Sequence, residues 1–176
     1  MSENQMTKTE RIFFISRAVG QYLALKRYAV SRECALPWPH VQPDLSLQRA
    51  DLLCVDKTLQ FVIVETKSSW EDFRSDSKWL AYLDWCHQFY FAADTETALR
   101  IAASDSVRKT RVGVLAVDEL GQVKAVHGAL RRNPPTLYTY RTQLLLNIVF
   151  RLSPYEMNGK LRKNTCFFPN DYFEKD

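Results

Sequence analysis

The sequence predicts an α/β fold: a single domain built on one mixed β-sheet. Apolar patterns with the periods of helices and of strands alternate along the chain, and two pairs of strand-like runs are joined by connections short enough for hairpins. The chain has 176 residues, 46% hydrophobic and 25% charged, with only 5 glycines, so it is long and apolar enough for one buried core. The predicted order of elements is α-β-β-β-α-β-α-β-β-α.

The first elements follow from periodicity and turn residues. Residues 9–27 are predicted to be a helix because apolar side chains recur every three or four positions. A strand follows over residues 28–36, and Pro37 ends it because proline lacks the N–H that a ladder needs. Residues 49–55 and 60–67 are two apolar or β-branched runs four residues apart, which predicts a hairpin. The second run is nearly all apolar, so we expect it to be central and covered on both faces.

The remaining elements alternate in the same way. In chain order they are a helix over 71–86, a strand over 88–92, a helix over 94–103, a hairpin of 111–117 with 122–130, and a helix over 136–152. Asp94 is the predicted N-cap of its helix, and Gly121 supplies the positive φ of the second hairpin turn. We expect residues 1–8 to be a flexible N-terminus, residues 9–152 the folded domain, and residues 153–176 a polar and aromatic tail.

Composition also bears on the cellular compartment. No stretch approaches the roughly 18 apolar residues of a membrane span, and the N-terminal residues are polar. The four cysteines include no C-x-x-C pair, so neither a disulfide framework nor a zinc site is indicated. We therefore expect a cytoplasmic protein with no membrane contact and with reduced thiols.

Basic side chains gather in the second half of the chain. The formal net charge is only +4, but the first 97 residues carry a slight excess of acids. The clusters are Arg108, Lys109 and Arg111, then Arg131 and Arg132, then Lys160, Arg162 and Lys163. This distribution permits a surface that faces phosphates. A solvated face with incidental charge is the alternative from charge alone.

The residues that suggest chemistry lie on the first hairpin. Asp51 is in its first strand, and Glu65, Thr66 and Lys67 end its second. Side chains alternate along a strand, so Glu65 and Lys67 emerge on one face and Thr66 on the other. If the hairpin folds symmetrically about Thr58, Asp51 lies directly opposite Glu65, with the Cβ atoms about 5 Å apart. The sequence therefore predicts two carboxylates and an ammonium in one place.

Two carboxylates so close repel each other unless a proton or a cation lies between them. Mg²⁺ or Mn²⁺ prefers oxygen ligands, and Asp51, Glu65 and the carbonyl of Thr66 are the expected ligands. Lys67 is then placed to orient an attacking water and to offset transition-state charge, which suits hydrolysis of a phosphodiester. The alternative is an ordinary surface ion pair between Glu65 and Lys67, worth less than about 1 kcal/mol.

These residues carry a family resemblance. Asp51 with Glu65-x-Lys67 on a hairpin, between helices, resembles the core of the PD-(D/E)XK (restriction-endonuclease-like) nuclease superfamily. More narrowly, RADLLCVD (49–56) and FVIVETKSSWEDFRSDSKWLAYLDWCHQFYFA (61–92) are similar to the MmcB-like family of bacterial DNA repair proteins. The resemblance implies a metal-dependent DNA nuclease acting in repair, with Mg²⁺ or Mn²⁺ as cofactor and DNA as partner.

The resemblance also implies further site residues. Glu33 matches an acidic position used as an additional metal or water ligand. Asp76, Lys78 and Tyr82 match residues that the family presents near the site, and Lys78 could contact the scissile phosphate. Four residues apart on the predicted helix 71–86, Lys78 and Tyr82 would share one face. The alternatives are that Asp76 only interacts with the helix dipole, that Lys78 is a surface cation, and that Tyr82 is a core residue. Two departures from the family pattern are Ala50 in place of proline and His87 in place of an acid.

Two questions stay open at the level of sequence. Fold does not guarantee activity, so a non-catalytic module that binds nucleic acid or protein on a nuclease-like fold is the second hypothesis. RNA as the substrate is a weaker third option, because no RNA-binding signature is present. Among the tryptophans, Trp79 and Trp85 are expected in the core. Trp38 and Trp70 lie in predicted loops, and stacking on bases is left open for them.

Overall fold

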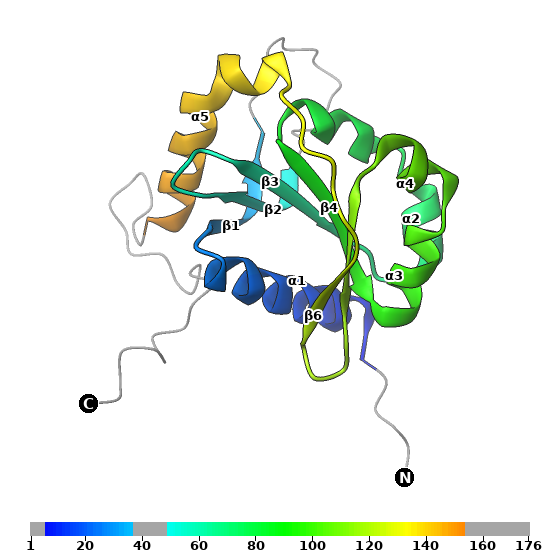
Figure 1. Ribbon diagram of the computed structural model, residues 1–176. Helices are drawn as coiled ribbons and strands as arrows, with labels where there is room; N and C mark the ends of the chain where they lie inside the picture. Colours follow the sequence, from blue (N-terminus) through cyan, green and yellow to red (C-terminus); the bar gives the residue numbers. More distant parts are fainter. Residues whose placement is uncertain (1–5, 37–48, 154–176) are drawn as a thin grey trace, which may run out of the picture.

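The computed structural model describes residues 6–36 and 49–153, which form one six-stranded sheet with helices on both faces (Figure 1). The strands lie side by side in chain order, from β1 to β6. Their bounds are β1 Ala29–Ala35, β2 Arg49–Val55, β3 Phe61–Thr66, β4 Gln88–Asp94, β5 Gly113–Val117 and β6 Val123–His127. Strands β3, β4 and β5 are mutually parallel, and every other neighbouring pair is antiparallel. The predicted mixed sheet in a single α/β unit is confirmed.

The helices divide unequally between the two faces. They are α1 Lys8–Leu25, α2 Trp70–Ser75, the 3₁₀-helix η1 Lys78–Asp84, α3 Thr95–Ala102, α4 Asp105–Thr110 and α5 Pro135–Leu152. Helix α1 packs on one face against Leu52, Val62 and Leu115, among others. The opposite face carries the larger core, to which α2, η1, α3, α4 and α5 all contribute buried side chains. All six residues of β3 are buried, which confirms that this strand is covered on both faces.

The first hairpin has the predicted register. Leu52 pairs with Val64 and Val55 pairs with Phe61, so the two strands are symmetric about Thr58. Asp56 organises the turn, because one of its carboxylate oxygens accepts the N–H groups of Thr58 at 2.8 Å and Gln60 at 2.9 Å. The turn thus fixes which residues of β2 and β3 face each other, and this decides the geometry of the candidate site.

The predicted helix over 71–86 is wrong. Helix α2 ends at Ser75, Asp76 is extended with ψ 108°, and the chain continues as the 3₁₀-helix η1. The carboxylate of Asp76 accepts the N–H of Lys78 at 2.8 Å, and such local bonds compete with helical ones. Helix α4 is absent from the predicted order because six residues carry too little periodicity to detect.

The tryptophans occupy different depths in the fold. Trp79 and Trp85 are buried in the larger core, as predicted, and Trp70 is half-buried on α2. No helix in residues 6–36 and 49–153 is long and apolar enough to cross a bilayer. Trp38, Lys160, Arg162 and Lys163 lie outside the described residues. The predicted domain boundaries at residues 8 and 152 stay a prediction, because most of the two end segments also lies outside the described residues.

Candidate functional site

The two acidic residues lie where the β2–β3 ladder stops. The last paired residues are Leu52 and Val64, so one further step in register sets Asp51 opposite Glu65. At that step the side chains replace ladder bonds: Asp51 Oδ2 accepts the N–H of Thr66 at 2.8 Å, and Glu65 Oε1 accepts the N–H of Asp51 at 3.2 Å. Each carboxylate is therefore tied to the backbone of the other strand, which holds the two acids together.

The residues after Glu65 alternate as predicted. Thr66 points to the α1 face, where its hydroxyl lies 2.9 Å from that of Ser16 in a buried hydrogen bond. Lys67 lies on the face of the acids: its Nζ is 2.5 Å from Asp76 Oδ2 and 5.7 Å from the ring centre of Phe91. The side chain of Lys67 is only 7% exposed, so the surface ion pair between Glu65 and Lys67 is not what forms. The buried ammonium of Lys67 pairs instead with Asp76, the residue that follows α2.

Burial dominates the electrostatics of the two acids. It raises the pKa of Asp51, partly opposed by the hydrogen bond from Thr66. Burial raises the pKa of Glu65 well above its ordinary value, and the Asp51 charge adds to this, while Lys67 lowers it. A carboxylate pair with raised pKa values holds a proton more readily than isolated acids and gains from a nearby cation.

Glu33 reaches the site from β1. Its φ of 49° departs from the extended backbone of the strand, and its carboxylate forms an ion pair with Arg49 Nε at 2.6 Å. The charge of Glu33 also contributes to the raised pKa of Asp51. The structure therefore places Glu33 within electrostatic reach of Asp51, although its nearest partner is a basic side chain.

Asp76, Lys78 and Tyr82 take separate positions. Asp76 joins the acids through Lys67, and its charge helps to raise the pKa of Glu65. Lys78 is exposed and Tyr82 is buried, so the expected common face is wrong: a 3₁₀-helix has three residues per turn, and residues four apart point in different directions. The hydroxyl of Tyr82 donates to the carbonyl of Arg49 at 3.2 Å, next to Ala50 and Asp51.

Asp72 and Arg11 belong to the surroundings of the site but were not predicted for it. Asp72 accepts hydrogen bonds from the N–H and the hydroxyl of Ser68, at 3.0 and 2.8 Å, and its charge contributes to the raised pKa of Asp51. Arg11, on α1, donates to the carbonyl of Ser68 at 3.3 Å. Asp72 had a sequence signal, as an acid in the first turn of a helix, but nothing linked Arg11 to residues 57 positions away.

The donor set suits a hard divalent cation through oxygen atoms alone. Asp51 Oδ1 and Glu65 Oε2 accept no hydrogen bond from the described residues, so each carboxylate keeps one oxygen for another partner. Within residues 6–36 and 49–153, no group of three His, Cys, Asp or Glu side chains is arranged to hold a metal ion. A cation here would take two carboxylates, a backbone carbonyl such as that of Thr66, and water, as Mg²⁺ commonly does.

Comparison with known proteins agrees with the fold and supplies a family. A solved structure described as "SPO1766 protein of unknown function from Silicibacter pomeroyi" is similar, with a TM-score of 0.61 and 22% identity over 82% of this chain and 86% of that one. At this identity the likeness concerns the fold. No curated protein matches the sequence. The family model "DNA repair protein MmcB-like" matches residues 2–136, and the chain therefore belongs to the MmcB-like DNA repair protein family.

Proposed function

We propose that this protein is a metal-dependent nuclease that hydrolyses phosphodiester bonds of DNA, with a site of the PD-(D/E)XK type and Mg²⁺ or Mn²⁺ as its cofactor. One observation carries the proposal: Asp51 and Glu65 are tied to each other's strands beside the buried ammonium of Lys67. Membership of a DNA repair family supports DNA as the partner.

Asp51, Glu65 and the carbonyl of Thr66 would hold the ion. When bound, a divalent ion lowers the pKa of a water molecule and stabilises negative charge on phosphate oxygens. Lys67 orients the attacking water and offsets charge in the transition state. Asp76 is a positioning residue, because its hydrogen bond fixes the ammonium on the face that the two acids share.

Three further residues have proposed roles at the rim. Glu33 supplies an additional carboxylate for the ion or for its water, which requires it to leave Arg49. Lys78, exposed at the start of η1, contacts the scissile phosphate. Tyr82 holds the start of β2 through the carbonyl of Arg49, so its role is to position Asp51.

The test is cleavage of labelled single-stranded, duplex and branched DNA with Mg²⁺ or Mn²⁺. We expect wild-type protein to cut at least one of these substrates and Asp51→Asn, Glu65→Gln and Lys67→Met to lose at least about a hundredfold in rate. The matched control is Glu119→Gln, an exposed acid in the β5–β6 turn, which should keep full activity. Equal activity in the Asp51→Asn and wild-type proteins would refute the proposed site.

The second candidate is a non-catalytic domain that binds nucleic acid. It is favoured by the lack of a third metal-ligating side chain near the pair among the described residues. Calorimetric titration with Mn²⁺ separates the candidates. Binding that disappears in Glu65→Gln supports the nuclease, and no binding at millimolar Mn²⁺ together with salt-dependent DNA binding supports the alternative.

A further inference from the structure

Away from the acids, three arginines line one hollow. It has a volume of about 560 Å³ and is bordered by Arg108 and Arg111 of the α4 end, His127 at the end of β6, and the segment from Gly128 to Arg131. No acidic side chain contributes to its lining. We call this hollow the arginine groove. Its composition differs from that of the candidate site, where acids predominate.

The arginines of the groove are exposed, and the nearest acid that the electrostatics show is Asp56, where the charge of Arg131 adds to the hydrogen bonds that lower the pKa of the carboxyl. Arg108, Arg111 and Arg131 are exposed, and none takes part in an ion pair within residues 6–36 and 49–153. The three like charges repel one another, so an anionic ligand in the groove would lower the electrostatic free energy. The field of Arg131 extends to its neighbours: after burial, its charge is the largest influence that lowers the pKa of His87.

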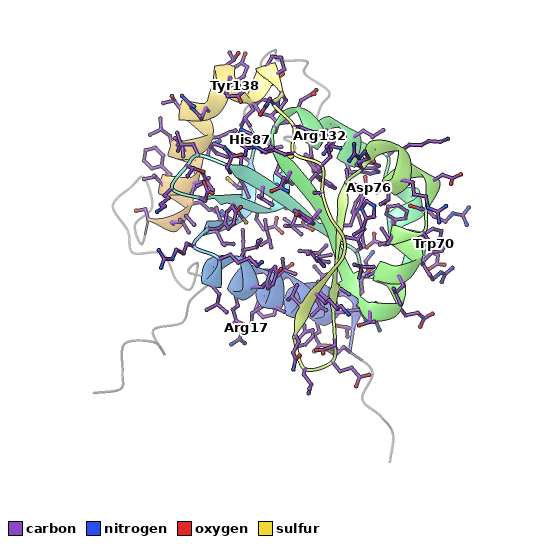
Figure 2. The ribbon with its side chains drawn as sticks, in the orientation of Figure 1. Arg17, Trp70, Asp76, His87, Arg132 and Tyr138 are labelled. Carbon is purple, nitrogen blue, oxygen red and sulfur yellow. The ribbon has the colours of Figure 1, made fainter. Side chains whose placement is uncertain are left out.

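The fold holds these cations together through the backbone. The N–H of Leu130 donates to the carbonyl of Arg111 at 2.8 Å, and the N–H of Arg132 donates to the carbonyl of His87 at 2.7 Å. The guanidinium of Arg132 also binds two carbonyls, those of Thr110 and Leu130. Figure 2 shows Arg132 and His87 on neighbouring segments in the upper part of the view. The segment that bears Arg131 is thereby fixed to the end of α4.

The remaining wall of the groove is also suited to an anion. His127 Nδ1 lies 2.9 Å from the carbonyl of Val112, so Nδ1 carries a proton and the ring is held in place. A Cβ added to Gly128 would meet no atom within 4 Å, which leaves open space above this backbone. Guanidinium groups bind phosphate with paired hydrogen bonds, and three of them around a hollow suit a ligand that carries several negative charges.

The groove and the acids lie at the same level of the sheet. Glu65 pairs with Phe91, Phe91 with Val114, and Val114 with His127. Three strand spacings amount to about 14 Å. Phosphates of one DNA strand advance by about 3.4 Å each along the axis, so about four nucleotides span the separation. Helices cover the buried Phe91 and Val114 between the two places, so this number is a minimum for one DNA molecule that contacts both.

We propose that the arginine groove is a binding site for the DNA phosphate backbone, separate from the acids of Asp51 and Glu65. This inference rests on the proposed function for the choice of DNA as the polyanion. It adds the place on the surface where the DNA is held and the residues that hold it. Since the groove contacts phosphates and no base edges, the binding that it provides is independent of sequence.

The experiment measures binding of a fluorescent duplex DNA by anisotropy in EDTA, where no metal-dependent cleavage occurs. Arg108→Gln with Arg131→Gln should weaken binding at least about tenfold and lower the slope of log affinity against log salt by about 2. The charge-matched control is Arg17→Gln with Arg100→Gln, both exposed and outside the groove. Figure 2 shows Arg17 on α1 in the lower part of the view, away from Arg132 in the upper part. The control pair should lose less than about threefold.

A second pair of variants leaves every arginine in place. Gly128→Asp puts a carboxylate into the open space of the groove and should weaken binding about tenfold, while Gly128→Asn, of the same size, should bind like wild type. Circular dichroism and thermal melting establish that each variant is folded. The proposal is overturned if wild-type protein does not bind duplex DNA, if the groove pair and the control pair lose affinity equally, or if Gly128→Asp binds like Gly128→Asn.

The outcome is distinguishable from failure of the proposed nuclease. Cleavage with metal and binding in EDTA are compared for wild type and for the groove variants, because no acid lines the groove. Selective loss of binding in the groove variants without any cleavage by wild type would keep the groove and remove the nuclease. Cleavage by wild type with unchanged binding in the groove variants would keep the nuclease and remove the groove.

Discussion

The ion pair between Lys67 and Asp76 should be strong, and its strength can be calculated from its geometry. The charged atoms are 2.5 Å apart and the side chains are 7% and 19% exposed. At that distance two unit charges attract by about 2 kcal/mol in water and about 7 kcal/mol at an effective dielectric of about 20. Because this pair is largely but not fully enclosed, we expect a coupling free energy of about 3 kcal/mol. Lys67→Met alone should cost about 3–5 kcal/mol, since it leaves buried acids without their cation.

The measurement is a double-mutant cycle on the free energy of unfolding, from urea titrations at pH 7 in EDTA. The variants are Lys67→Met, Asp76→Asn and their combination; asparagine keeps an acceptor for the N–H of Lys78. The matched control is the cycle on Lys8 and Asp72, which lie 3.5 Å apart with side chains 66% and 25% exposed, where coupling should stay below about 1 kcal/mol. If the Lys67 pair couples no more strongly than the control, the ammonium is screened by water and the enclosed site is refuted.

Three further predictions concern stability. Burial lowers the pKa of His87, whose Nδ1 accepts the Phe61 N–H at 2.9 Å. The free energy of unfolding should therefore fall as the pH drops below about 6.5, the pKa of histidine in the unfolded chain, towards the lower pKa of the folded state. In urea titrations at a series of pH values, His87→Asn should show a flatter dependence over that range than wild type. Gly113→Ala should cost about 1–3 kcal/mol in thermal unfolding, because the new Cβ would lie 2.2 Å from the Tyr90 ring, and Tyr90→Ala should relieve the cost. Thr66→Val should cost about 1–3 kcal/mol by leaving the buried Ser16 hydroxyl unpaired, whereas the pair Ser16→Ala with Thr66→Val should be closer to wild type; equal costs would contradict this.

The fold was predictable where local chemistry determines it. The Asp56 turn fixed the register of β2 and β3, and the apolar run of β3 indicated a central strand, because each signal lies within about ten residues. The break between α2 and η1 was not predicted, since the helical period continues through Asp76 while the backbone does not. Side-chain bonds to the backbone decide such breaks, and periodicity is insensitive to them.

The candidate site was predictable for the residues of one hairpin and less so beyond it. Register and alternation placed Asp51, Glu65 and Lys67 together, because both are properties of two adjacent strands. The prediction that Lys78 and Tyr82 share one helical face was wrong, because it assumed an α-helix where the chain forms a 3₁₀-helix. The arginine groove joins α4 to the segment after β6, and the charge clusters were visible in the sequence, but only tertiary structure shows that Arg108 and Arg131 line one hollow.

The position of the acids at the end of a ladder connects the chemistry to the fold. A regular ladder would satisfy the N–H of Thr66 with a carbonyl of β2, but here the Asp51 carboxylate accepts it, and the Asp51 N–H is satisfied by Glu65. Removing a carboxylate therefore removes both a charge and a hydrogen bond that the sheet requires. Asp51→Asn retains an acceptor for Thr66 and removes only the charge, whereas Asp51→Ala removes both. A nuclease site built this way should lose activity equally in the two variants, with only Asp51→Ala also losing about 1–3 kcal/mol of stability; equal stability would mean that the carboxylates do not hold the strands.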